Sequence, residues 1–390
     1  MSRRFILALL CLAGLAGQLQ AQDQLRRLLP TDDSLSRVGL SRKWFAFAPI
    51  DGSRETIQEV KLMWDQIHLQ TNASRIHAID AESGKVLWST QLGNPIPGQF
   101  GSAINSNSVF VINGSRLYRL SRGDGSQLWS IHLPQSPNAP PAADENNVIV
   151  GTLNGRVYVF NVNTKEVRWF YQTNGPISVP ALAIDDRFAC ASEDGKMYVF
   201  SPANRNPTLR YQTDAAVSAP LAAWGRAAIL PSEDFNLYSV DVRTGETNWR
   251  YAAGSEIRQP VTVIGSEIFV FPDDGGMHVL NAESGSRVWR HPRGRDFIAA
   301  SRDRVYATDS FGQLLVLDRA TGRQIGSWNA RDFQFHVRND SNDRVYLVSK
   351  SGMLVCLCEP KNEAPSVHQK VLPPQTTDEP GRGQSGTGKK

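Results

Sequence analysis

The chain has 390 residues, of which 41% are hydrophobic and 21% are charged, and its formal net charge is +4. The composition is that of an ordinary globular protein. A net charge this small, without any run of Lys and Arg, argues against a nucleic-acid-binding protein, so no nucleic-acid partner is predicted.

The first 21 residues predict a secretory signal peptide. Two arginines precede an apolar run over residues 5–16, which is too short to be a convincing membrane span. Cleavage is expected after Ala21, with Ala16 as the alternative. Cys11 follows a leucine, whereas a lipid-attached cysteine follows a small residue, so no lipid anchor is predicted. The protein is therefore expected to be exported, periplasmic or secreted, and not membrane-spanning.

Two segments flank the main part of the chain. Residues 22–40 predict a short linker with at most one helical turn, and the polar, Pro- and Gly-rich residues 361–390 predict a disordered tail. Between them lie Cys190, Cys356 and Cys358, an odd number that gives no disulfide framework. We interpret these cysteines as small apolar residues of the core, with a metal pair or a redox pair at 356 and 358 as the alternative.

Between the linker and the tail, one motif recurs with a period near 40 residues, and such a period sets the architecture. The motif has a polar residue, a turn, usually a Gly, and then a Trp, as in "AIDAESGKVLW" at 78–88. A copy that lacks the Trp lies near Arg210. Five copies of one motif predict that the Trp packs between neighbouring repeats rather than serving a catalytic centre. The motif tryptophans are Trp88, Trp129, Trp169, Trp249 and Trp289.

Two β-rich runs around Asn-Gly, Asp-Gly or Gly-Gly lie between successive motifs, as in "VIVGTLNGRVYVF" at 148–160, and they predict β-hairpins. Eight such hairpins occur. The last one, near Met353, has no following Trp strand, and the missing strand is found near the N-terminus around Trp44. We therefore predict an all-β, eight-bladed β-propeller over residues 41–360. Strands from the N- and C-terminal parts of the chain close one blade and leave no open sheet edge.

The motif "AIDAESGKVLW" resembles the tryptophan-docking motif of the quinoprotein (PQQ-like) β-propeller repeat, and the resemblance extends over residues 41–358. One branch of that family consists of dehydrogenases that hold pyrroloquinoline quinone (PQQ) and calcium in the propeller channel. The BamB branch is non-enzymatic and is part of the periplasmic machinery that assembles outer-membrane β-barrels. Many of the enzymes stack a disulfide between neighbouring cysteines on the quinone. This chain has only Cys-x-Cys at 356–358 and no assignable calcium-linked Asp.

The resemblance to the BamB branch implies an exported scaffold or protein-interaction module, with a role in envelope or outer-membrane protein assembly and without a cofactor. The alternative is a PQQ-dependent dehydrogenase with quinone and calcium in the channel. The sequence favours the scaffold over the enzyme, because it offers no recognisable catalytic, cofactor-binding or metal-binding residue.

A candidate partner-binding site follows from aligning the segments that lead from each Trp to the innermost strand of the next blade. Arg258 and Arg295 occupy this position in adjacent blades, and Arg293 lies close by. An arginine pair suits a carboxylate, which predicts other envelope proteins or peptides as partners, acidic ones in particular. The alternative is that these charges are solvated or paired with Glu256 and Asp296. The candidate residues at this channel mouth are Gln99, Asn138, Arg258, Arg293 and Arg295.

Overall fold

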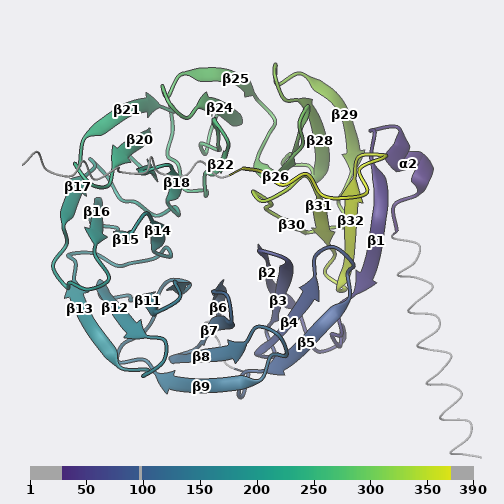
Figure 1. Ribbon diagram of the computed structural model, residues 1–390. Helices are drawn as coiled ribbons and strands as arrows, with labels where there is room; N and C mark the ends of the chain where they lie inside the picture. The colour runs from purple at the N-terminus through teal and green to yellow at the C-terminus, as the bar shows by residue number, and fades with distance from the viewer. Residues whose placement is uncertain (1–28, 96–98, 370–390) are drawn as a thin grey trace, which may run out of the picture.

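The protein forms a ring of eight four-stranded antiparallel sheets (Figure 1). This architecture, seen in a computed structural model that describes residues 29–95 and 99–369, confirms the predicted all-β, eight-bladed propeller. The predicted signal peptide (1–21) and most of the predicted tail lie outside the described residues, as do the side chains of Gln99 and Phe100.

We number the blades in chain order and name the innermost strand of each blade first. Blade 1 consists of β2 (Ile57–Met63), β3 (Gln66–Thr71), β4 (Arg75–Asp80) and β5 (Val86–Gln91). Blade 2 consists of β6 (Gln99–Ile104), β7 (Ser108–Asn113), β8 (Arg116–Ser121) and β9 (Gln127–His132). Blade 3 consists of β10 (Ala142–Ala143), β11 (Asn147–Gly151), β12 (Arg156–Asn161) and β13 (Val167–Gln172). Blade 4 consists of β14 (Leu182–Ile184), β15 (Arg187–Ala191), β16 (Lys196–Phe200) and β17 (Leu209–Gln212).

The second half of the ring repeats this order. Blade 5 consists of β18 (Ala222–Trp224), β19 (Ala227–Pro231), β20 (Asn236–Asp241) and β21 (Thr247–Ala252). Blade 6 consists of β22 (Thr262–Ile264), β23 (Glu267–Val270), β24 (Met277–Asn281) and β25 (Arg287–His291). Blade 7 consists of β26 (Asp296–Ala300), β27 (Arg304–Thr308), β28 (Gln313–Asp318) and β29 (Gln324–Asn329). Blade 8 consists of β30 (Phe335–Val337), β31 (Val345–Val348), β32 (Met353–Cys358) and β1 (Ser41–Phe47).

The two middle strands of each blade supply the hydrophobic core. In blade 3, β11 is fully buried and β12 is buried except at its ends, whereas the outer strand β13 is half-buried or exposed throughout. Successive side chains of a strand point to opposite faces of its sheet, and here each face meets a neighbouring blade. One cluster, which contains Phe110, Trp129 and Val148, therefore joins blade 2 to blade 3.

Blade 8 joins the two ends of the ring. β1 pairs antiparallel with β32, with Trp44 opposite Cys356 and Phe47 opposite Met353. The other edge of β32 pairs with β31. This confirms the predicted closure, in which the N-terminal strand completes the last blade and covers an edge that would otherwise be open.

The segment before β1 packs against the ring. The short helix α2 (Asp32–Ser36) begins after Thr31, whose side-chain oxygen accepts a hydrogen bond from the backbone N–H of Ser34 at 3.3 Å. Leu35 and Leu40 are buried against blades 7 and 8. The described part of the predicted linker is thus attached to the propeller core. No helix in the described part of the chain is long and apolar enough to cross a membrane.

Candidate interaction site

The motif tryptophans lie at the junctions between blades. Each indole N–H donates to a backbone carbonyl in the turn that precedes the outermost strand of the next blade. The pairs are Trp88 with Arg122 (2.9 Å), Trp129 with Val162 (3.0 Å), Trp169 with Pro202 (3.0 Å), Trp249 with Ala282 (2.9 Å) and Trp289 with Arg319 (2.8 Å). Trp44 of β1 makes the same contact with Ala81 of blade 1 at 3.2 Å.

Two junctions lack a tryptophan. Leu209 stands opposite Val199, the position that Trp takes in other blades, so Leu209 occupies the Trp position of the copy expected near Arg210. In blade 7 the position belongs to Gly326, and a Cβ there would lie 3.3 Å from Val38 of the segment before β1. All eight junctions are thus filled by a side chain, and close packing accounts for the motif.

The acids of the motif turns bind their own turns. Oδ1 of Asp80 accepts a hydrogen bond from the backbone N–H of Ser83 at 2.8 Å, and Oδ1 of Asp318 accepts one from Thr321 at 2.9 Å. Such bonds favour tight turns. These carboxylates are engaged in local structure, which is a reason not to assign them a catalytic role.

The turns of the ring divide between two faces. We call the face with the inter-blade loops and the turns between second and third strands the upper face. In blade 5, a hydrogen bond of 2.8 Å from the N–H of Ala253 to the carbonyl of Phe235 joins these two kinds of loop. The lower face carries the tryptophan-docking turns. All five candidate residues of the channel mouth belong to the upper face.

Arg258 and Arg295 approach one turn of blade 6 from two inter-blade loops. Arg258 forms ion pairs with Asp273 at 2.5 Å, with Glu233 at 3.5 Å and with Glu256. Arg295 donates from Nη1 to the backbone carbonyl of Asp273 at 2.8 Å. The hydrogen bond that Arg258 donates to the carboxylate of Asp273, together with the neighbouring acids, raises the pKa of Arg258 above its usual value. The charge of Arg258 is therefore compensated within the protein.

The other candidates do not extend this pair into an open cationic site. Arg293 forms an ion pair with Asp309. The side-chain amide of Asn138 donates to the carbonyl of Ile177 at 3.3 Å. Gln99 is the first residue of β6, and its side chain lies outside the described part. An uncompensated arginine pair is thus not what the structure contains, and contact of these residues with a partner stays a prediction.

Arg338 reaches from blade 8 to the innermost strands of blades 6 and 7. Its Nη2 lies 2.5 Å from Asp296, its Nη1 lies 3.2 Å from the hydroxyl of Thr262, and its guanidinium lies 5.9 Å from the ring centre of Phe271. The sequence suggested Asp296 as a partner of the candidate arginines and did not single out Arg338. One feature of the sequence could have pointed to Arg338. The connection between the first and second strands of blade 8, residues 338–344, is longer than the corresponding turns of the other blades.

A cavity of about 380 Å³ lies between the innermost strands of blades 4, 5 and 6 and the C-terminal part of the described chain. Its walls are mainly β14, β18 and β22, together with Arg338, Asp340, His368 and Gln369. Nε2 of His368 is buried without a hydrogen-bond partner in the described structure, and burial lowers the pKa of this imidazole. No cluster of three or more His, Cys, Asp or Glu within the described ranges is placed to hold a metal ion.

The C-terminal residues 359–369, which we call the strap, cross the lower face of blade 8 (Figure 1), and its last residues, His368 and Gln369, line this cavity. Arg344 is fully buried beneath them and donates from Nη1 to the carbonyl of Asn362 at 3.0 Å and from Nη2 to that of Glu363 at 2.8 Å. The side-chain amide of Asn362 donates to Asp343 at 3.0 Å. Composition assigns most of the strap to a tail, whereas these contacts place it on the ring.

The three cysteines are free and buried. Burial raises the pKa of the thiols of Cys190 and Cys356 far above the usual value. Because the thiolate is the reactive and metal-binding form, these side chains behave as small apolar groups of the core.

A family model described as "Outer membrane protein assembly factor BamB" matches residues 72–216, 178–298 and 210–371. A curated relative with the same description, from Burkholderia pseudomallei (strain K96243), is 30% identical over 108 residues. That alignment covers 28% of this chain and 28% of the relative, so the chain matches less than a third of the relative's length.

Two solved structures show the likeness in fold. BamB from Moraxella catarrhalis superposes with a TM-score of 0.67 and 17% identity, over 83% of this chain and 98% of that one. Quinohemoprotein alcohol dehydrogenase from Comamonas testosteroni superposes with a TM-score of 0.62 and 11% identity, over 83% of this chain and 77% of that one. At these identities the likeness concerns the propeller alone.

Proposed function

Because the chain belongs to the family of the outer membrane protein assembly factor BamB, we propose that it is an exported, non-enzymatic scaffold that binds other envelope proteins during outer-membrane protein assembly. The family match, over three overlapping stretches between residues 72 and 371, carries this proposal. The relative from Burkholderia pseudomallei is named as an assembly factor, and that role comes to this chain only as part of the proposal.

The geometry supports a binding role. The tryptophans and acids of the repeated motif are engaged in joining blades and shaping turns. The strap lies over part of the lower face, whereas the upper face presents inter-blade loops. Loops held by a rigid scaffold are common sites of recognition. The upper face is therefore the surface on which we expect partners to bind.

The proposal is tested by cross-linking the mature protein in its own envelope and identifying the attached proteins. We expect the same outer-membrane assembly components in every preparation, at near-stoichiometric yield. An exported protein of similar size and charge, without a propeller, serves as the control. Attachment to no envelope protein above that control would contradict the scaffold function.

The competing function, a quinone-dependent dehydrogenase, has its own test. The purified protein is mixed with PQQ and calcium, desalted, and examined for quinone absorbance and for dye-linked oxidation of alcohols and sugars. The scaffold proposal expects neither signal. A stoichiometric quinone spectrum after desalting would support the enzyme instead.

A further inference from the structure

The turn between the second and third strands of a blade ends on a residue in the left-handed region. In five blades this residue is a glycine: Gly155 (φ +81°), Gly195 (φ +80°), Gly276 (φ +82°), Gly312 (φ +73°) and Gly352 (φ +84°); in blade 1 it is the small residue Ser74 (φ +59°). In blade 5 the same position, at φ +71°, belongs to Phe235. A bulky side chain in this region is an outlier, because its Cβ crowds the backbone. Phe235 thus departs from the pattern of the other blades at this turn position.

The adjoining inter-blade loop departs from the repeat at the same place. In blade 4 the hydroxyl of Thr213 donates to the carbonyls of Gly195 and Ala215, both at 2.8 Å. A Cβ on Gly195 would lie only 2.7 Å from the carbonyl oxygen of Ala215. The equivalent of Thr213 in the next blade is Ala253, which has no hydroxyl and is followed by Gly254 at φ +92°. The inter-blade loop after blade 5 therefore lacks the threonine at the position next to Phe235.

Phe235 gains little from the protein itself. Its side chain is 50% exposed, and no ring contact or cation–π contact of Phe235 occurs within the described structure. Trp64, on the lower face, is equally exposed and also left-handed, at φ +58°. However, the guanidinium of Arg122 lies 4.9 Å from the ring centre of Trp64, so an internal contact supports that aromatic. No comparable support explains Phe235.

Acidic residues predominate in the turn of Phe235 and in the loops next to it. In the loops 213–220, 232–235, 253–260 and 271–276, which belong to this part of the upper face, Arg258 is the sole basic residue. The acids of these loops are Asp214, Glu233, Asp234, Glu256, Asp273 and Asp274.

Arg258 compensates part of this charge through Asp273, Glu256 and Glu233. Arg290 and Arg295 also reach the turn 271–276, where each donates to a backbone carbonyl, so six acids stand against three arginines. Asp214 and Asp274 are exposed and form no ion pair with any described residue. The surface around the aromatic ring therefore carries excess negative charge, which favours a partner of opposite charge.

We propose that Phe235 is the apolar anchor of a contact site for a partner segment that places a Lys or Arg beside an apolar side chain. This inference rests on the proposed scaffold function and specifies the chemistry of the partner. A half-exposed aromatic ring supplies the apolar contact area, and the surrounding carboxylates attract the basic residue and orient the segment. The partner segment proposed here is basic, whereas an open pair of arginines would favour an acidic partner.

Site-directed photo-cross-linking tests the place and the chemistry together. The photoreactive amino acid p-benzoylphenylalanine replaces Phe235 in one version of the full chain and Trp64 in another, and both are irradiated in their own envelope. We expect attachment at position 235 and little at position 64. The attached peptide, read by mass spectrometry, should contain Lys or Arg next to an apolar residue. No attachment at 235, or an attached peptide with net negative charge, would overturn the proposal.

The matched substitutions Phe235→Gly and Trp64→Gly then measure affinity. Each introduces glycine at a left-handed position, so neither is expected to unfold the ring. The probe is a synthetic peptide with the sequence attached at position 235, used alongside a version with its basic residues changed to Glu. We expect Phe235→Gly to weaken binding of the basic peptide by about tenfold or more, Trp64→Gly to leave it unchanged, and the Glu version to bind poorly.

The outcomes separate this site from the scaffold function. If envelope proteins attach to the protein but Phe235→Gly binds the peptide as tightly as the natural chain, the site is wrong and the scaffold function stands. If no envelope protein attaches at any position, the scaffold function itself fails.

Discussion

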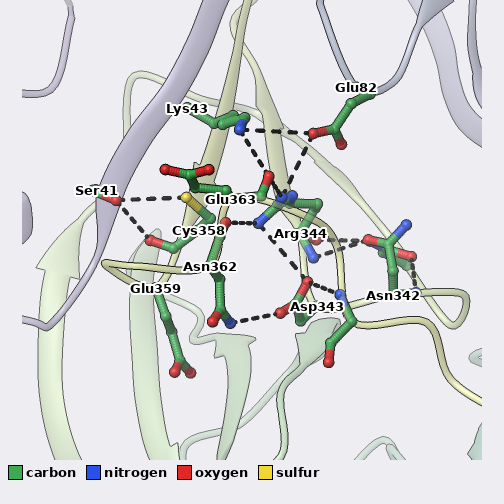
Figure 2. Close-up of polar contacts among 12 residues, drawn as sticks. Ser41, Lys43, Glu82, Asn342, Asp343, Arg344, Cys358, Glu359, Asn362 and Glu363 are labelled. Carbon is green, nitrogen blue, oxygen red and sulfur yellow. Dashed lines mark hydrogen bonds and ion pairs between the residues drawn. The ribbon is translucent and has the colours of Figure 1, made fainter.

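Arg344 holds Glu363 of the strap: Nη2 of the buried arginine donates to the backbone carbonyl of Glu363 at 2.8 Å (Figure 2). Nη1 of Arg344 makes the matching bond to the carbonyl of Asn362. The carboxylates of Glu82, at 3.6 Å, and Asp343, at 4.0 Å, balance the charge. A buried charge tolerates this position only while its hydrogen bonds are satisfied, so the ring and the strap stabilise each other.

Arg344→Ala should release the strap. We expect the free energy of unfolding to fall by roughly 2–4 kcal/mol, because the charge-assisted hydrogen bonds and the packing of a fully buried side chain are lost. Trypsin should also cut after Lys361 many times faster under native conditions, since the backbone there is no longer held. Urea denaturation and timed proteolysis measure the two effects. Arg243→Ala, at an exposed ion pair with Asp185, is the control. An unchanged rate of cleavage at Lys361 would contradict the prediction.

Local signals made the fold predictable. A period near 40 residues, Asn-Gly and Asp-Gly turns and a half-repeat around Trp44 specify eight blades and their closure, because each feature is encoded within a few residues. The strap could not be found in this way. Its polar composition resembles that of a solvated tail. The strap is nevertheless bound to Arg344 through the backbone carbonyls of Asn362 and Glu363. Every residue has such a carbonyl, so composition cannot predict which ones accept a hydrogen bond from a buried arginine.

The candidate site was predictable only in part. Alignment of the repeats correctly placed Arg258 and Arg295 in equivalent loops, but it could not show that both approach Asp273, which lies on another turn. Phe235 did leave a signal, because "SEDF" at 232–235 replaces the "SEDG" of 192–195. The replacement is informative only because this position has a left-handed backbone conformation, which the structure shows.

Glycine to alanine substitutions should separate backbone strain from steric clash at the docking turns. Gly285 (φ +68°) lies beneath a motif tryptophan, and a Cβ there would be 2.5 Å from the ring of Trp249. Gly254 (φ +92°) is also left-handed, but a Cβ there would meet nothing within 4 Å. We expect Gly254→Ala to cost about 1 kcal/mol and Gly285→Ala about 2–3 kcal/mol more, because the docked ring must move. Thermal or urea unfolding measures the difference, and equal losses would contradict the docking geometry.

Buried neutral histidines should make the protein less stable in acid. Burial lowers the pKa of His68 to about 3 and that of His77 to about 4. Oγ of Ser102 lies 2.8 Å from Nδ1 of His68, and Oε1 of Gln66 lies 3.2 Å from Nε2. The amide oxygen can only accept, so Nε2 carries a proton, and the lowered pKa keeps the ring neutral at pH 7. Below pH 6.5 these histidines bind protons in the unfolded chain but stay neutral in the folded chain. The free energy of unfolding therefore falls as pH falls.

The expected slope is up to about 1.4 kcal/mol per pH unit for each such histidine between pH 6.5 and the folded pKa. The variant His68→Gln removes one of these protons, so its loss of stability between pH 6 and pH 4 should be shallower than that of the natural chain. Urea denaturation at each pH measures both slopes. Above pH 7.5 the two curves should run parallel, because the imidazoles are neutral in both states. Identical slopes in acid would contradict the role of His68.

Closure of blade 8 should control the cooperativity of the whole ring. A chain that begins at residue 48 lacks β1, so it loses the pairing of Ser41–Phe47 with β32 and the docking of Trp44 on the carbonyl of Ala81. It also lacks α2 and Leu35. We expect a loss of several kcal/mol and self-association, because the exposed edge of β32 becomes free to pair with another chain.

Two comparisons isolate the strand from the rest of the deletion. A chain that begins at residue 41 keeps β1 but lacks α2, and it should lose less stability than the chain that begins at residue 48. A synthetic peptide of residues 38–50, added to the shorter chain, should raise its melting temperature and reduce its self-association, because the peptide supplies the missing edge strand. Circular dichroism and light scattering follow both effects. If the chain that begins at residue 48 melts like the one that begins at residue 41, β1 does not close the ring energetically.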